Sequence, residues 1–371
     1  MATTQRTERT QVSAPRQTLL IDTDIHEYLR SVDDLLPYLP PVWQRFVTEY
    51  GWRILDINNG WPYAPVAPRR PDWILADGTM ATDVASMAEH VFDEEQVNFG
   101  ILCGLYHVSA LQAEYDFARA LASAYNDWQI EHWLEKDHRL AGSVHVVAQD
   151  PALAAREIDR VAEHPRILQV FLPSVTDRQY GDPYYRPIFE AAVRNDLIVA
   201  LHIGGHTKTV LGYPRYFIEW HTVAGPQAAM NQLLSLICNG LFDKYPTLKV
   251  ALLETGVAWV PWFMWRLDQQ YRELRIQVPW VKRLPSEHMR DSVRLSTQPM
   301  GDIKAQDFVK LVEMVDSERM FMFSTDYPHY DADTAPQVLP GSLPESLRMR
   351  IRHQNALETY PRLPGLVSVA E

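Results

Sequence analysis

The sequence predicts an α/β fold, a (β/α)8 TIM barrel that occupies most of the 371-residue chain. Three observations lead to this prediction. Short segments that favour β-strands alternate with segments of helical length, the strand segments are apolar throughout, and about eight such units follow one another. Strands that are apolar on both faces are typical of a parallel sheet covered by helices. Eight units in one domain of this size favour a closed barrel over an open sheet.

The predicted strands share a β-rich, almost continuously apolar composition. They are residues 18–24, 97–102, 142–147, 167–172, 197–203, 248–254, 293–296 and 320–324. The segments between them have the pattern of amphipathic helices. The clearest of these are residues 114–135, 151–163, 187–195, 227–245 and 307–315. Alternating strands and helices imply right-handed crossovers between neighbouring parallel strands.

Residues 31–90 depart from this alternation and are rich in Pro, Trp and Tyr, with the cluster GWPYAPVAPRRPDW at 60–73. We expect a long insertion after the first strand, folded over the top of the barrel, because so long a loop usually acts as a lid or binding element. Residues 1–17 are polar and rich in Thr, Gln and Arg, which predicts a disordered tail. Residues 18–371 are then a single barrel domain.

Charge and composition limit the classes of partner. The formal net charge of -12 disfavours nucleic acid and anionic membrane surfaces, and no apolar run approaches the length of a membrane span. The N-terminal residues lack the apolar segment of a secretory signal. Cys103 and Cys238 lie in apolar stretches and are expected to be buried, reduced thiols, which favours the cytoplasm. The expected partner is a small-molecule substrate.

Ionisable residues stand at the ends of several predicted strands. Asp24 and His26 end the first strand, His202 the fifth and Glu254 the sixth, and Asp326 follows the eighth. Strands of a parallel barrel end on one face, where active sites form, so we expect these side chains to meet. Burying so many polar groups together is costly unless a metal or a proton network satisfies them. A metal site is therefore the favoured interpretation.

Two further histidines extend the set of candidate ligands. His221 lies in FIEWHT after the fifth strand, where a structural role is equally open, and His329 follows the strand-eight aspartate in DYPH. The full set of three carboxylates and four imidazoles exceeds what one tetrahedral zinc needs. It suffices for two metals, and mixed carboxylate and imidazole ligation suits iron or manganese. A single zinc ion is the alternative.

Four motifs together resemble the amidohydrolase-related proteins grouped with aminocarboxymuconate-semialdehyde decarboxylase, over roughly residues 18–360. They are IDTDIH at 21–26, LHIGG at 201–205, FDKYPTLKVALLETGVAWVPWFMWRLD at 242–268 and FSTDYPH at 323–329. The resemblance implies that Asp24, His26, His202 and Asp326 are metal ligands.

Three departures from the family pattern add ligand candidates. Asp24 and Glu254 stand where these decarboxylases commonly have a histidine, and His329 is a histidine that they do not require. The set with these additions is similar to that of a branch of the family, the TIM-barrel dinuclear iron or manganese/iron monooxygenases. That resemblance implies hydroxylation of an aliphatic carbon of a small organic acid or its thioester. Glu254, Asp326 and His221 are then the catalytic residues, and a separate ferredoxin and reductase supply electrons.

Two other functions stay open on the sequence. One is a mononuclear zinc or manganese hydrolase or non-oxidative decarboxylase, with Asp326 or Glu254 as the general base. The other is a metal-binding partner subunit of a homologous catalytic chain. The family resemblance also implies a homo-oligomer, or a hetero-oligomer with such a subunit.

Overall fold

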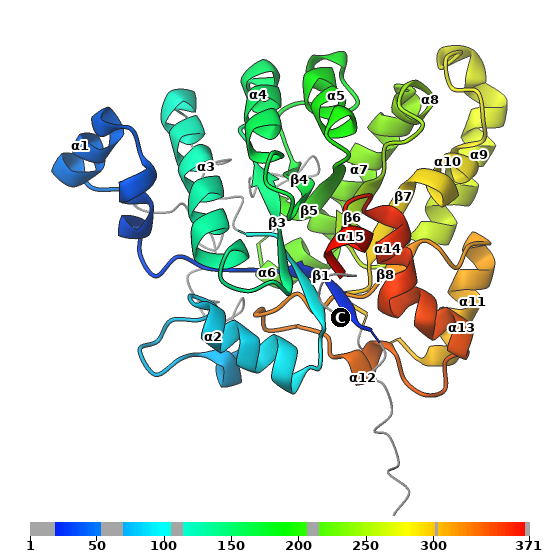
Figure 1. Cartoon of the computed structure of the whole chain (residues 1–371). Coiled ribbons are helices and arrows are strands. Elements are labelled where there is room, and N and C mark those ends of the chain that lie inside the picture. Colours follow the sequence, from blue (N-terminus) through cyan, green and yellow to red (C-terminus); the bar gives the residue numbers. More distant parts are fainter. Residues whose placement is uncertain (1–18, 53–69, 105–113, 206–214, 301–302, 368–371) are drawn as a thin grey trace, which may run out of the picture.

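The computed structural model describes residues 19–52, 70–104, 114–205, 215–300 and 303–367. Eight parallel strands, hydrogen-bonded in the order of the sequence, form a nearly closed barrel surrounded by helices (Figure 1). The strands are β1 (Ile21–Ile25), β2 (Phe99–Leu102), β3 (Leu140–His145), β4 (Ile167–Val175), β5 (Ile198–Gly205), β6 (Val250–Leu253), β7 (Val293–Ser296) and β8 (Phe321–Met322). The predicted TIM barrel is confirmed, with most strand bounds displaced by one to three residues.

The barrel closes where β1 meets the segment that follows β8. Ile25 forms a bridge with Tyr327, and the amide of His26 donates to the carbonyl of Tyr327 at 2.8 Å. The amide of Asp326 donates to the carbonyl of Asp24 at 3.1 Å. These backbone bonds bring the predicted ligands Asp24 and Asp326 together, although they lie 302 positions apart in the sequence.

Helices form the outer layer of the barrel. The main ones are α3 (Tyr115–Gln129), α4 (Pro151–Val161), α5 (Arg186–Arg194), α7 (Gly225–Cys238), α9 (Val260–Leu274), α10 (Pro285–Ser292) and α11 (Ala305–Val315). The helix expected at 227–245 is interrupted, because Gly240 adopts a left-handed φ of +70° between α7 and α8 (Leu241–Lys244). The helix expected at 114–135 continues from α3 into the π-helical η6 (Ile130–Leu134).

Helix α4 illustrates how local sequence sets these elements. Asp150 caps its start by accepting a hydrogen bond from the amide of Leu153 at 3.1 Å, and Pro151 occupies the first turn. Its apolar stripe, which includes Ile158 and Val161, is buried. Burying each such side chain stabilises the fold by about 1.5–3 kcal/mol.

The interior of the barrel is filled with side chains, so the barrel is not a pore. Ile101, Ala200 and Leu253 belong to this interior cluster. Two residues join this cluster from the end at which the strands begin. They are Tyr360, which follows α14 (Asn355–Thr359), and Leu363, the first residue of α15 (Leu363–Val367). The opposite end of the barrel is left for polar residues.

The described part of residues 31–90 contains η1 (Val32–Tyr38), α1 (Pro41–Tyr50), η3 (Pro71–Trp73), α2 (Val84–Met87) and the start of η4 (Ala88–Glu94). It contacts the segment that follows β8. The rings of Trp73 and Tyr327 lie 4.7 Å apart, and Nδ1 of His90 is 2.9 Å from the hydroxyl of Tyr327. This contact places the described end of the segment against the chain that carries Asp326. Most of the 60–73 cluster lies outside the described residues.

Several other predictions meet the structure only in part. Cys103 is buried as expected, but Cys238 is half-buried. The tail predicted at 1–17 lies outside the described residues. Among the helices that the structure describes, none is long and apolar enough to cross a membrane.

Candidate metal centre

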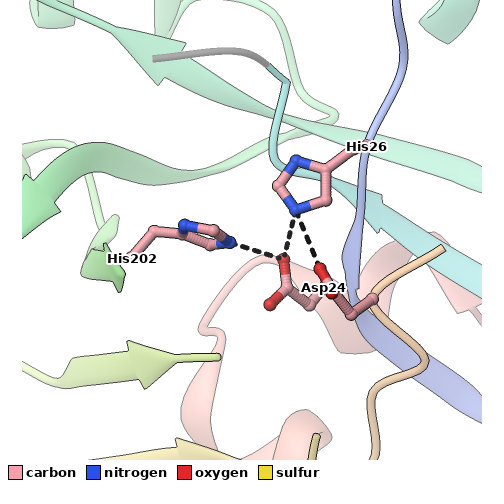
Figure 2. A group of neighbouring side chains, drawn as sticks. Asp24, His26 and His202 are labelled. Atoms are coloured by element: carbon pink, nitrogen blue, oxygen red, sulfur yellow. Dashed lines mark ion pairs between the residues drawn. The ribbon is translucent and has the colours of Figure 1, made fainter. Parts of the chain in front are cut away.

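The structure brings four of the predicted ligands together at the end of the barrel where the strands finish. Asp24 comes from β1, His26 follows it, His202 lies in β5 and Asp326 follows β8. All four are at most 2% exposed, and one ligand atom from each lies within 4.8 Å of the others. Figure 2 shows the two imidazoles directed at the carboxylate of Asp24.

Backbone carbonyls orient both imidazoles. Nδ1 of His26 lies 2.8 Å from the carbonyl oxygen of Gly104, and Nδ1 of His202 lies 2.7 Å from that of Ile203. A carbonyl oxygen only accepts hydrogen bonds, so each neutral ring carries its proton on Nδ1. Each ring can then bind a metal ion through the lone pair on Nε2. Nε2 of His26 is 3.4 Å, and Nε2 of His202 is 3.8 Å, from Oδ1 of Asp24. This arrangement is typical of imidazoles that bind a metal.

The polar atoms of this group fit a cation. Within the described part of the chain, both carboxylate oxygens of Asp24 and Nε2 of His26 are buried without a hydrogen-bond partner. Burial raises the pKa of Asp24 to about 6, although His26 opposes the shift. Burial and the nearby charges of Glu254 and Asp24 raise the pKa of Asp326 well above its usual value. A divalent cation would offset both shifts.

Glu254 lies beside this group at the end of β6, with a left-handed φ of +55°. Its amide donates to Oγ of Ser296 at 2.9 Å, which anchors the turn to β7. Oε2 is 3.3 Å from Nε2 of His202, and Oε1 is 2.9 Å from Nε2 of His221. Glu254 therefore connects the four-residue group with His221, which lies in η8 (Trp220–Ala224).

Asp331 is a member of the site that the sequence analysis missed. Its Oδ2 lies 3.7 Å from Nε2 of His221, and ligand atoms of Asp331, His221 and Glu254 lie within 4.8 Å of one another. Asp331 comes five residues after Asp326, in a loop without strand periodicity. The only signal in the sequence is a third acidic or imidazole side chain in the segment DYPHYD.

His329 contacts the ligand group through Asp326. Its Nδ1 lies 2.8 Å and 2.9 Å from the two carboxylate oxygens of Asp326, and its Nε2 lies 3.1 Å from the hydroxyl of Tyr28. Burial lowers the pKa of His329 well below its usual value, so the ring is neutral. Nδ1–H then donates to Asp326, and the Tyr28 hydroxyl donates to Nε2. Although Glu254, Asp326 and His329 also form a compact group, both nitrogens of His329 are already engaged.

Asp22 stabilises the backbone on either side of the ligand group, and the sequence analysis did not include it among the candidates. Its Oδ1 accepts from the amides of Asp24 and Thr325 at 3.1 Å each, and its Oδ2 accepts from the Thr325 hydroxyl at 2.6 Å. Burial raises the pKa of Asp22 to about 7, against these hydrogen bonds. Asp22 thus ties β1 to the segment that presents Asp326.

Comparisons with known proteins agree with this fold. The family model described as amidohydrolase matches residues 21–362. The gamma-resorcylate decarboxylase of Polaromonas sp. strain JS666 is 27% identical over 295 residues, which cover 75% of this chain and 87% of that protein. The gamma-resorcylate decarboxylase of Rhodococcus jostii is 27% identical over 298 residues, covering 75% and 88%.

Solved structures share the barrel at lower sequence identity. The 5-carboxyvanillate decarboxylase of Sphingomonas paucimobilis aligns with a TM-score of 0.72 at 22% identity, covering 93% of this chain and 99% of that one. The dihydroxybenzoic acid decarboxylase of Polaromonas sp. JS666, solved with manganese and 2-nitroresorcinol, aligns with a TM-score of 0.64 at 21% identity. It covers 93% of this chain and 97% of that one. These likenesses establish the fold.

The predicted monooxygenase function is wrong, because the curated relatives are named decarboxylases. That prediction counts Glu254 and His329 as additional ligands and therefore expects two metals. In the structure Glu254 is hydrogen-bonded to His221, and His329 to Asp326. Side chains that satisfy one another do not require a second ion. The presence of two metals, and the ligand roles of His221, Glu254 and His329, stay predictions.

Proposed function

We propose that this chain, which belongs to the amidohydrolase family, is a metal-dependent, non-oxidative decarboxylase of a hydroxylated aromatic acid. The observation that carries the proposal is the buried group of Asp24, His26, His202 and Asp326 at the end of the barrel. The names of the curated relatives support the reaction and the substrate class.

Asp24, His26, His202 and Asp326 would hold one divalent ion. Manganese is the first candidate, because related structures contain it and because this mixed donor set suits it. When bound, the ion would supply Lewis acidity toward oxygen atoms of the substrate. The protein's own contribution is to present the four ligand atoms in a buried position. Asp22 maintains that presentation by joining β1 to the segment before Asp326.

Decarboxylation replaces a carbon–carbon bond with a carbon–hydrogen bond, so the site must deliver a proton to the ring carbon. We assign that proton to the carboxyl group of Asp326, which is fully buried. His329 contacts both oxygens of Asp326, and Tyr28 contacts the far nitrogen of His329. These three side chains form a continuous hydrogen-bonded path by which Asp326 regains a proton after each turnover.

Glu254 and His221 form the second working pair. Burial opposes ionisation of Glu254, but the hydrogen bond from His221 and the neighbouring imidazoles lower its pKa to about 2. An ionised carboxylate beside the ligand group is suited to accept a hydrogen bond from a hydroxyl group of the substrate. We therefore assign Glu254 to that role and His221 to its orientation.

The test is an assay under nitrogen with manganese-loaded protein. The substrates are 2,6-dihydroxybenzoate and 5-carboxyvanillate, and carbon dioxide and the decarboxylated phenol are both measured. We expect equal amounts of the two products without oxygen or reductant, loss of turnover on chelation, and recovery with manganese. Glu254→Gln, which keeps the size of the side chain and removes its charge, is the matched variant.

Two results would contradict the proposal. One is the absence of carbon dioxide from hydroxylated benzoates, which would favour a hydrolase or a metal-binding partner subunit. The other is turnover only with oxygen and an electron donor. A non-oxidative reaction has no use for the ferredoxin and reductase expected for an oxygenase. Assembly as a homo-oligomer, or with a homologous subunit, stays a prediction.

A further inference from the structure

Glu27 follows His26 directly and is completely buried. Its carboxylate accepts three hydrogen bonds. Oε2 accepts from the amide of Gly104 at 3.0 Å, and Oε1 accepts from the Tyr125 hydroxyl at 3.1 Å and from Nε2 of Gln129 at 2.5 Å. Every donor is neutral, so these bonds offset only part of the cost of burying a carboxylate. A carboxylate kept under these conditions calls for a role beyond packing.

Gly104 lies two residues after β2. Both of its backbone polar groups form hydrogen bonds with His26 and Glu27, two consecutive residues that follow β1. Its amide donates to Glu27, and its carbonyl accepts the Nδ1–H of His26 at 2.8 Å. Its φ is +65°, which favours glycine. A Cβ at this position would lie 2.5 Å from Nε2 of His145 and 2.9 Å from Cε1 of Tyr125. The backbone at Gly104 is therefore closely confined.

We infer that Glu27 is a positioning residue for the metal centre. By holding the amide of Gly104, Glu27 directs the carbonyl of the same residue at Nδ1 of His26. That carbonyl keeps the proton on Nδ1, so Nε2 is presented as the ligand atom. Nε2 of His26 lies 3.2 Å from Oδ1 of Asp326, within the ligand group. The inference rests on the metal ligands of the proposed function and is independent of the reaction.

Three variants of the full-length protein separate this role from packing. Glu27→Leu fills the space but cannot accept a hydrogen bond from Gly104. Glu27→Gln keeps an oxygen that can face the Gly104 amide. Tyr125→Phe removes another hydrogen bond of the same carboxylate and leaves the bond to Gly104 in place. Glu27→Met is a second apolar replacement if Glu27→Leu does not fold, and thermal unfolding identifies the folded variants.

The first measurement is the Kd for Mn²⁺, from the signal of the free ion in electron paramagnetic resonance. We expect Glu27→Leu to raise Kd about 10- to 100-fold, as loss of an outer-shell partner typically does. Glu27→Gln should restore most of the affinity, and Tyr125→Phe should match the unmodified protein. Wild-type affinity in Glu27→Leu would overturn the inference, as would an equal loss in Tyr125→Phe.

The second measurement does not depend on the metal or on turnover. Nitrogen-15 chemical shifts of His26 in metal-free protein report which ring nitrogen carries the proton. We expect Nδ1–H in the unmodified protein, in Glu27→Gln and in Tyr125→Phe, and a mixture of tautomers in Glu27→Leu. An unchanged tautomer in Glu27→Leu would overturn the inference. Failure of the unmodified protein to bind Mn²⁺ would instead overturn the proposed function, and the tautomer would still test the role of Glu27.

Discussion

The two ends of the barrel both bury polar side chains, but they satisfy them differently. In the barrel interior, which Tyr360 enters from the end where the strands begin, its hydroxyl donates to Oε1 of Gln169 at 3.1 Å, and Nε2 of Gln169 donates to Oγ of Ser143 at 2.9 Å. Where the strands finish, within the described residues, the carboxylate of Asp24 and Nε2 of His26 are buried without hydrogen-bond partners. Burial of polar groups is therefore common to both ends, whereas the unsatisfied atoms of Asp24 and His26 gather within the candidate ligand group.

Left-handed backbone conformations occur at both ends, since Gln96, Asp196 and Asp316 adopt them before β2, β5 and β8. Glu254 and Asp326 hold φ values of +55° and +63° at the ends of β6 and β8. Such conformations cost of order 1–3 kcal/mol each for residues other than glycine, and they persist where surrounding contacts require them. Here they turn two carboxylates toward one site. Conformational cost is therefore shared by both ends, whereas a bound cation would relieve the electrostatic cost of the unsatisfied atoms of Asp24 and His26.

The largest expected effect is that of Asp326→Asn at the functional end. The amide retains one oxygen for the metal but cannot act as a proton donor of comparable acidity. We expect kcat for decarboxylation to fall by about 10²- to 10⁴-fold, the usual contribution of a positioned acid or base. Steady-state kinetics and metal analysis of the same preparation check this expectation. Activity within tenfold of the unmodified protein would assign the proton to another residue.

Removal of the metal should leave the ligand atoms of the functional end unsatisfied and so lower the free energy of unfolding. At a free Mn²⁺ concentration about 100 times Kd, binding to the folded state adds about 2.7 kcal/mol to the free energy of unfolding. Denaturant unfolding with Mn²⁺ and with chelator measures the gain. His26→Ala is the control, and it should show no gain. Equal stability of the unmodified protein under both conditions would argue against the ligand group.

Tyr360→Phe tests the end where polar groups satisfy one another. The variant leaves Oε1 of Gln169 without this donor and should lower the free energy of unfolding by about 0.5–1.5 kcal/mol. Because the lost hydrogen bond goes to Gln169 and not to a member of the ligand group, we expect Kd for Mn²⁺ and kcat/KM to stay unchanged. A marked loss of metal affinity would show that the two ends are coupled through the barrel interior.

The smallest expected effect is on the pH dependence of stability, and it involves a residue of the helical layer. His288 in α10 is buried, and burial lowers its pKa below 6.5 although Asp243 opposes the shift. The unfolded chain therefore binds more protons, so this contribution to stability is complete above about pH 6.5 and is lost as the pH falls toward the folded-state pKa. His288→Gln should flatten the decline of stability between about pH 7 and pH 5. The flattening should be the same with and without metal, and a metal-dependent difference would link α10 to the site.

Local sequence signals predicted the parts of the molecule that depend on neighbouring residues. Continuous apolar runs located the strands, and the ends of those runs located Asp24, His26, His202 and Glu254, because parallel strands must finish on one face. Boundaries shifted where backbone geometry intervened, as at Gly240, whose left-handed φ separates α7 from α8.

The function depended on information that strand patterns do not contain. A count of carboxylates and imidazoles cannot show that Glu254 pairs with His221 or that His329 pairs with Asp326. The comparison with named relatives then overturned the oxygenase and supports the proposal of a decarboxylase.

The sequence by itself determined the barrel and the end at which its chemistry lies, since periodicity and strand termini are local properties. Only the tertiary structure decided which polar groups satisfy one another and which are left for a cation. Asp331 reaches His221 from another loop, and Asp22 reaches Thr325 across the closure of the barrel. These contacts join residues far apart in the chain, and their geometry follows from loop conformations that no repeating pattern encodes.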